Sequence, residues 1–148
     1  MIKIRQTNGM KANGKAYASM VQAILEDVYD SAPWTLEQTL SDMSRADSNY
    51  YLAFEANGTA IGCLATSVIM DEVEITNLAV SKAYQHQGVA SLLLKALLSQ
   101  EGKFFLEVRE SNQKARLLYE KHGFETYFIR KNYYQKPNED ALLMKREK

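Results

Sequence analysis

A polar junction with a single glycine connects a strand-like run to a helix-like run near the middle of the chain. The apolar run ITNLAV (75–80) has the length of a buried strand, and from Gly88 onward apolar residues recur with a helical period. A helix N-terminus presents unpaired N–H groups and about half a positive charge, and a glycine there lets an anion approach the backbone. The stretch from Gln85 to Ala90 therefore predicts an anion site, or else a tight turn that the glycine only eases. It contains neither GxxxxGK[ST] nor GxGxxG, which excludes the common nucleotide-binding loops.

Strand-like and helix-like segments follow one another in an order that predicts a mixed sheet. Apolar patterns predict strands at 1–7, 50–56, 59–70, 72–80, 103–110, 124–134 and 141–147. Helical periodicity predicts helices at 15–28, from 36 after the N-cap Thr35, from 88 to about 102, and from the N-cap Ser111 to Gly123. The dipeptide Asn57-Gly58, which accepts positive φ at both turn positions, predicts a hairpin. Two strand–helix–strand stretches predict a parallel pair, so the expected class is α+β or α/β with three layers.

Composition limits the class of protein. A length of 148 residues favours one domain over residues 1–148, and 18 basic against 18 acidic residues give no sign of a nucleic-acid surface. The sequence has no apolar run of about 18 residues and no signal-peptide core, so we expect neither a membrane span nor secretion. The lone Cys63 is expected in the core of a cytoplasmic protein. Two widely separated histidines exclude a metal site and, with Cys63, a Cys–His catalytic pair.

The junction and its flanks resemble the acetyl-CoA-binding core of the GNAT N-acetyltransferases. The shared features are the I-x-x-L-A-V strand, the Q-x-x-G-x-A loop and a leucine-rich helix. The resemblance implies a mostly antiparallel sheet with a splayed parallel pair, helices on both faces, and acetyl-CoA as co-substrate. In that family the loop amides bind the CoA pyrophosphate and the preceding strand pairs with the acetyl-pantetheine arm. Carried onto this chain, the cofactor-binding residues are Leu78, Ala79, Val80, His86, Gln87, Gly88, Val89, Ala90 and Ser91. Ala90 stands where the family more often has glycine.

Further stretches resemble the RimI-type bacterial ribosomal-protein-alanine N-acetyltransferases: LEVRESNQKARLLYEKHGF (106–124), RKNYYQKPNEDALLMK (130–145) and APWTLEQTL (32–40). The resemblance implies acetyl transfer to a protein N-terminal α-amine, above all the N-terminal alanine of a small-subunit ribosomal protein. One alternative is a GNAT enzyme with another acceptor, such as another protein N-terminus, a lysine side chain or a small amine. The other is a catalytically silent CoA-binding or ribosome-associated module, against which the presence of both Glu107 and Tyr119 argues.

Glu107 is the expected general base. A peptide α-amine has a pKa of about 7.7–8.0, so a weak base can remove its proton near neutral pH. The apolar neighbours of Glu107 in the strand 103–110 would dry its surroundings and raise the carboxyl pKa toward the working pH. The resemblance assigns Glu107 the same role. The alternative is an ion pair with Arg109 on the same strand face, and Glu74 is either a rival base or an edge charge in solvent.

Tyr119 is the expected general acid. It shares a helical stripe with Ala115, Leu118 and His122, so periodicity alone favours a packed core tyrosine. The resemblance assigns its phenol to reprotonation of the CoA thiolate, and Asn112 to hydrogen bonding of the cofactor. The alternative for Asn112 is capping of the helix. His122, at the end of the same helix, is expected as an imidazolium that complements the helix dipole.

The polar residues toward the C-terminus are assigned to acceptor binding. Tyr133 and Tyr134 are consecutive, so on a strand they should point to opposite faces, one of them toward an acceptor-peptide groove. Four charged residues beside them either position that peptide or form a solvated face: Arg130, Lys131, Glu139 and Asp140. His86 is expected as a solvated loop residue close to a phosphate.

Overall fold

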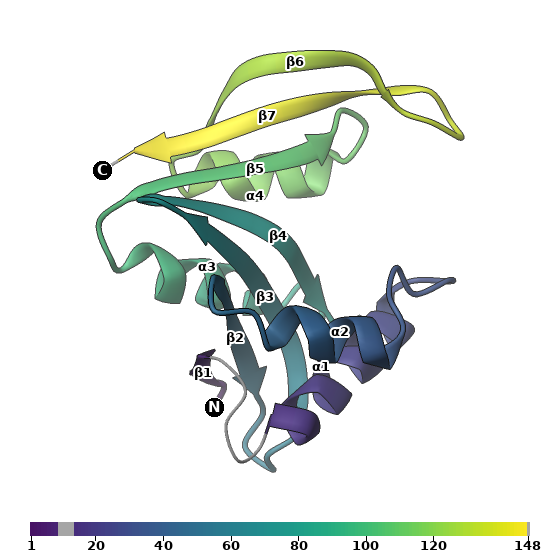
Figure 1. The fold of residues 1–148 in the computed structure, drawn as a ribbon, viewed down its shortest axis with the longest axis vertical. Coiled ribbons are helices and arrows are strands. Elements are labelled where there is room, and N and C mark those ends of the chain that lie inside the picture. Colours follow the sequence, from purple (N-terminus) through teal and green to yellow (C-terminus); the bar gives the residue numbers. More distant parts are fainter. Residues whose placement is uncertain (9–13, 148) are drawn as a thin grey trace.

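The computed structural model describes residues 1–8 and 14–147, which fold around a seven-stranded sheet of order β1-β2-β3-β4-β5-β7-β6 (Figure 1). The strands are β1 Lys3–Asn8, β2 Ser48–Phe54, β3 Ala60–Ile69, β4 Glu72–Val80, β5 Lys103–Arg109, β6 Glu125–Tyr134 and β7 Glu139–Glu147. The helices are α1 Gly14–Val28, α2 Leu36–Met43, α3 Val89–Leu98, α4 Gln113–Lys121 and the short 3-10 helix η1 Lys82–Tyr84. Among the strands that the structure describes, only β4 and β5 pair in parallel. The predicted class and mixed sheet are confirmed.

The two parallel strands separate soon after they begin. Pairing between β4 and β5 runs only from Glu72 to Glu74 on one strand and from Lys103 to Phe105 on the other. Beyond this point Thr76 has no partner on β3, because Ala65 pairs with Asn77 and the next residue pairs with Ile75. An unpaired extra residue bends its strand, so β4 turns away from β5 (Figure 1). The result is a V-shaped opening in the middle of the sheet.

Helices cover both faces of the sheet, which makes three layers (Figure 1). Helices α1 and α2 pack on one face and share a buried cluster with β2, β3 and β4: Ala18, Val21, Ile24, Leu25, Met43, Tyr50, Leu52, Cys63, Ala65 and Ala79. Helices α3 and α4 pack on the other face with a larger cluster that includes Leu93, Leu97, Phe104 and Tyr119. Cys63 is buried as predicted, and this burial raises the pKa of its thiol to about 12. A neutral, buried thiol is a core residue rather than a nucleophile.

Two local predictions need correction. The hairpin between β2 and β3 forms, but only Gly58 adopts a positive φ (+89°), and its N–H donates to the Glu55 carbonyl at 2.9 Å. The turn is therefore a three-residue loop with the glycine in the left-handed position, rather than a two-residue loop. Helix α3 ends at Leu98 rather than near Gly102, because the Ser99 hydroxyl donates to the Ala96 carbonyl (2.8 Å) and competes with further helix.

The start of α2 matches its prediction closely. The Thr35 side chain accepts the N–H of Gln38 at 3.2 Å, and the Gln38 side chain accepts the N–H of Thr35 at 2.9 Å. This reciprocal capping box satisfies two backbone donors that a helix start leaves open. Within residues 1–8 and 14–147, no helix is long and apolar enough to cross a membrane.

Candidate active site

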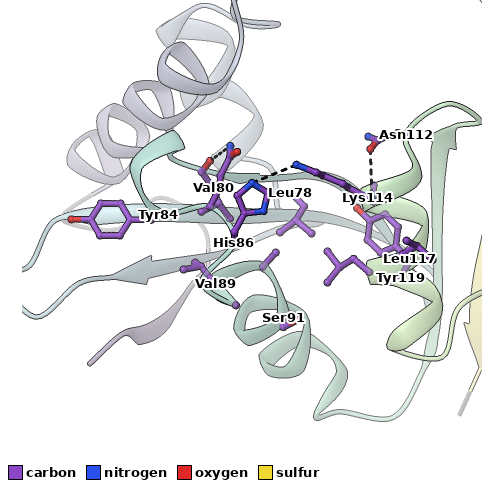
Figure 2. Close-up of a pocket in the computed structure, with 15 residues that line it drawn as sticks. Leu78, Val80, Tyr84, His86, Val89, Ser91, Asn112, Lys114, Leu117 and Tyr119 are labelled. Atoms are coloured by element: carbon purple, nitrogen blue, oxygen red, sulfur yellow. Dashed lines mark hydrogen bonds between the residues drawn. The ribbon is translucent and has the colours of Figure 1, made fainter.

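A pocket of about 550 Å³ lies at the V-shaped opening, on the side of the sheet that carries α3 and α4 (Figure 2). The end of β4, the loop into α3 and the first turns of α4 form its walls. Its lining residues are Leu78, Val80, Tyr84, Gln85, His86, Gly88, Val89, Ala90, Ser91, Asn112, Lys114, Ala115, Leu117, Leu118 and Tyr119. The walls are mostly apolar, and the polar groups gather where the two helices begin.

The N-terminus of α3 forms one wall of this pocket. Gly88 is its N-cap residue with φ +82° and ψ +10°, a left-handed conformation that suits glycine. No side chain caps the helix, and the first intrahelical bond runs from the Leu92 N–H to the Gly88 carbonyl. A Cβ built on Gly88 meets no atom within 4 Å, so the space above this backbone is open. The free N–H groups of the first turn are therefore available to an anion.

Two cationic or ionisable side chains face each other across the pocket mouth. Lys114 Nζ lies 3.4 Å from His86 Nε2, and Figure 2 shows them reaching toward one another from α4 and from the loop. His86 has φ +65°, and its side chain lines the pocket. A negatively charged group at the α3 N-terminus would also meet this pair.

Nearly all the predicted cofactor-binding residues lie in this pocket, with two exceptions. Ala79 is only 4% exposed and packs in the α1 layer, because alternate residues of a strand face opposite sides. The Gln87 side chain turns away and donates to the Ala83 carbonyl at 3.4 Å. Sequence reasoning missed six lining residues: Tyr84, Gln85, Lys114, Ala115, Leu117 and Leu118. Gln85 opens the loop motif itself, and helical spacing from Tyr119 would have identified Ala115.

Tyr119 lies in the pocket wall as part of the core. Its ring is 8% exposed and packs edge-on against Phe124, with ring centroids 5.7 Å apart. Burial raises the pKa of Tyr119 to about 12, so its hydroxyl keeps its proton throughout the neutral range. The ring lies across the pocket from Leu78 (Figure 2). Tyr119 therefore combines the packed environment that periodicity predicts with a protonated donor at the cavity surface.

The start of α4 corrects the predicted cap. Asn112, not Ser111, is the N-cap residue, and its Oδ1 accepts the Ala115 N–H at 3.2 Å. Ser111 precedes the cap and donates its N–H to the Glu139 carboxylate at 2.7 Å. Asn112 also lines the pocket, so the capping role and a contact with a ligand are compatible.

The end of α4 also differs from the prediction. His122 Nε2 lies 3.2 Å from the Ser91 hydroxyl in the first turn of α3. Partial burial, followed by the charges of Lys121, Lys95 and Arg146, lowers the pKa of His122 below its ordinary 6.5. The lowered pKa disfavours the expected imidazolium, and the ring connects the two helices through Ser91.

The opposite face of the sheet carries a second pocket of about 310 Å³ beside the V-shaped opening. Its lining residues are Ser67, Ile69, Glu72, Glu74, Phe105, Leu106, Glu107, Tyr127, Arg130 and Leu143. Glu107 and the rival base Glu74 thus share one pocket, and Glu74 is the more exposed of the two. Tyr119 lies on the other face, so a ligand that fills the opening would separate Glu107 from Tyr119.

The surroundings of Glu107 are wetter than predicted, and its ion-pair partner is different. Its side chain is 29% exposed, because Leu106 and Val108 point to the α3–α4 face. The carboxylate lies 3.9 Å from Arg130 Nη1 on β6. Arg109 pairs with Glu139 instead, at 3.3 Å.

Tyr133 and Tyr134 do not point to opposite faces. Their ring centroids are 5.2 Å apart in an edge-on contact. Strand β6 carries three residues between the pairs Arg130–Ala141 and Tyr134–Glu139, where β7 has only one, and Asn132 adopts φ +52°. This bulge breaks the alternation of the strand, so the expectation for a regular strand is wrong.

Acidic residues of β7 hold the bulge in place. Asp140 accepts the Asn132 N–H at 2.9 Å and pairs with Lys131 Nζ at 3.1 Å, and these contacts lower the pKa of its carboxyl. Hydrogen bonding from the Ser111 side chain, then from the Ser111 N–H, followed by the Arg109 guanidinium, lowers the pKa of Glu139. Both carboxylates are thus committed to structural contacts. In the described part of the chain, no three His, Cys, Asp or Glu residues are grouped as a metal site would require.

Known proteins resemble this chain in sequence and in fold. Residues 17–124 match the acetyltransferase (GNAT) family. The chain is 38% identical over 120 residues to the [ribosomal protein bS18]-alanine N-acetyltransferase of Haemophilus influenzae, covering 76% of this chain and 80% of that one. It is 36% identical over 119 residues to the Escherichia coli enzyme of the same name, covering 76% and 79%. The crystal structure of the ribosomal-protein-S18-alanine N-acetyltransferase from Escherichia coli has a TM-score of 0.84 at 28% identity, covering 99% of this chain and 93% of that one.

Proposed function

The chain belongs to the GNAT family of acetyltransferases, and from this premise we propose that it transfers acetyl from acetyl-CoA to the N-terminal alanine of ribosomal protein bS18. The observation that carries the proposal is the similarity to relatives named for that reaction, at 36–38% identity over three quarters of both chains. The reaction needs a site for a phosphate-bearing thioester, a base for the amine and a donor for the departing thiolate.

The pocket on the α3–α4 side suits acetyl-CoA. The free N–H groups after Gly88 would hold its pyrophosphate, and Lys114 would add a positive charge at the mouth. Leu78 and Val80 offer an apolar strand edge at the V-shaped opening. When bound, acetyl-CoA supplies an activated acetyl group. Side chains of this protein carry out the proton transfers.

The two faces of the sheet suit two different tasks. We assign the pocket with Glu107 and Glu74 to the acceptor peptide, because it opens on the face away from the CoA pocket. Glu107 takes the proton of the incoming α-ammonium, directly or through a water molecule. Tyr119, whose phenol carries its proton at neutral pH, donates to the sulfur as the C–S bond breaks. Its buried position excludes bulk water from that step.

The test is acetyl-CoA turnover with peptides that carry the N-terminus of bS18. We expect acetylation of the α-amine of the peptide that begins with alanine. A peptide with a blocked α-amine and a free lysine is the matched control, and it should remain unmodified. Peptides that differ only in their first three residues then define the preference. Faster transfer to the lysine, or to a small amine, would replace the proposed acceptor. No turnover with any acceptor, despite acetyl-CoA binding, would leave a CoA-binding module.

A further inference from the structure

A third pocket, which we call the basic pocket, lies at the C-terminal ends of α3 and α4. It is a surface pocket of about 540 Å³ lined by Lys95, Leu98, Lys121, His122, Gly123, Arg146 and Glu147. Lys95 and Lys121 come from the last turns of the two helices, and Arg146 comes from the end of β7. None of its basic side chains takes part in the proposed acetyl transfer.

Arg146 occupies a position where the fold otherwise places core residues. On β7, Leu142 and Met144 face the α3–α4 layer and are at most 4% exposed. Strand alternation puts Arg146 in the same row, and it pairs with the fully buried Phe104 of β5. Its side chain lies against Gly123, where an added Cβ would come within 3.2 Å of the guanidinium Nε. A charged side chain thus extends under the end of α4.

The guanidinium of Arg146 is not satisfied by the protein. Its Nη1 is buried and has no hydrogen-bond partner among the described residues. A buried donor without an acceptor is costly, more so when it carries charge. The carboxylate in the pocket lining, Glu147, pairs at 3.0 Å with Lys145 instead. The guanidinium of Arg146 therefore has no carboxylate partner among the described residues of this pocket.

The other basic side chains of the pocket add positive charge beside Arg146. Lys121, Lys95 and Arg146 all act on His122, where their charges join partial burial in lowering the pKa. A lysine in the last turn of a helix also complements the helix dipole, which accounts for Lys95 and Lys121 taken singly. It does not account for the buried Arg146 donor. The convergence of both lysines with Arg146 and His122 in one pocket makes it a concentrated site of positive charge.

We propose that this pocket binds a small phosphate-type oxyanion, either inorganic phosphate or a phosphate monoester. A tetrahedral oxyanion offers several acceptors, which suits a guanidinium, two ammonium groups and an imidazole that approach from different sides. A small ligand fits better than a nucleic-acid backbone, because the pocket holds only about 540 Å³ and the chain carries 18 basic and 18 acidic residues. The inference does not depend on the proposed acetyl transfer.

The test is a phosphate titration of the full chain saturated with CoA, followed by NMR of its two histidines. CoA occupies the other anion site beforehand, and sodium chloride keeps the ionic strength constant. His122 lines the basic pocket and His86 lines the CoA pocket. Because His122 also contacts Ser91 of the CoA pocket at 3.2 Å, CoA is kept saturating throughout, so that any further change at His122 comes from the basic pocket. We expect saturable shifts of His122 with a rise in its pKa, because an anion favours the imidazolium. His86 should stay unchanged.

Matched variants decide whether the basic side chains are responsible. Lys121→Gln and Arg146→Met should each weaken phosphate binding by about tenfold or more, the effect of one charge-assisted hydrogen bond. Methionine keeps the aliphatic stem of Arg146, and a thermal melt checks that this variant is folded. Should it unfold, Lys121→Gln alone decides. Lys3→Gln removes an exposed cation from β1 at the edge of the sheet and should bind phosphate like the parent.

Several results would overturn the proposal. One is a His122 response no larger than that to chloride, and another is equal phosphate affinity in Lys121→Gln and the parent. A response confined to His86 would move phosphate to the CoA pocket. If a short RNA binds and phosphate does not, the basic pocket is part of a nucleic-acid surface instead. Among supporting results, tighter binding of O-phosphoserine than of phosphate identifies a monoester as the ligand, and the reverse identifies the free ion.

Discussion

Arg130 Nη1 lies 3.9 Å from Glu107 Oε1, which pairs the proposed base with a cation from the edge strand β6. Arg130 is 45% exposed and also lies over the Tyr133 ring, 5.1 Å from its centroid. Ion pairs this exposed contribute only about 0–1 kcal/mol, so an incoming ammonium can displace Arg130 at little cost. The pair therefore does not block a catalytic role for Glu107.

Glu107→Gln keeps the shape of the side chain and removes its basicity. We expect kcat/KM to fall about 10²-fold or more at neutral pH, the usual scale for loss of a general base. The loss should shrink above about pH 8, because the α-amine is then already deprotonated. The measurement is a pH profile of acetylation of an alanine-first peptide.

Glu74→Gln is the matched control, since Glu74 lines the same pocket. We expect it to alter the acceptor KM rather than the pH profile of kcat. If Glu74→Gln shows the pH-dependent loss and Glu107→Gln does not, the two carboxylates exchange roles.

Gly88→Ala tests the anion site at the start of α3. A Cβ on Gly88 meets no protein atom, so alanine adds only the strain of a positive φ and a methyl group in the pocket. We expect the KM for acetyl-CoA to rise by about tenfold, which is the change in affinity expected when one good contact is lost. Gly58→Ala is the control, because Gly58 has a similar φ of +89° and equally open space but lies outside the pocket. Equal acetyl-CoA affinity in the two variants would contradict the anion site.

The carboxylates that hold the β6–β7 hairpin predict its behaviour in acid. The folded pKa values of Glu139 and Asp140 are lowered from the ordinary 4.5 and 3.8. Their stabilisation is therefore complete above those ordinary values and is lost as the pH falls through the lower folded values. The amide signals of Ser111 and Asn132, the N–H donors, should titrate below pH 4.5 and 3.8 respectively.

Two variants check this hairpin prediction. Asp140→Asn should abolish the pH-dependent shift of the Asn132 amide signal. Glu120→Gln, which replaces an exposed residue of α4, should preserve that shift. If the amide signals of Ser111 and Asn132 titrate with midpoints at or above the ordinary pKa values, their hydrogen bonds to Glu139 and Asp140 do not form in solution.

Local patterns predicted most of the secondary structure. The strand at 72–80, the N-cap Thr35 and the buried Cys63 each depend on neighbours in sequence, and each is confirmed. The loop glycine at 88 was identifiable for the same reason, because a helix start has a recognisable pattern.

Features that depend on partners distant in sequence were not predictable. The Glu107 carboxylate meets Arg130 rather than Arg109, since only the order of strands β5-β7-β6 decides which cation is near. The bulge at Asn132 exists because Asp140 binds it from the neighbouring strand.

Tyr119→Phe separates a packed tyrosine from a general acid. Phenylalanine keeps the ring and its contact with Phe124, so a merely structural residue should lose little activity. A general acid should lose kcat by about 10²-fold or more while acetyl-CoA still binds, because the proton is needed only as the C–S bond breaks. Tyr51→Phe is the control: Tyr51 belongs to the same core cluster, is 5% exposed and loses only a 3.4 Å contact with Gln100. Since the pKa of Tyr119 is raised to about 12, the parent enzyme should also keep its acid form, and its kcat, well into alkaline solution. Near-parental kcat in Tyr119→Phe, with Tyr51→Phe alike, would return Tyr119 to the core and leave solvent as the proton source.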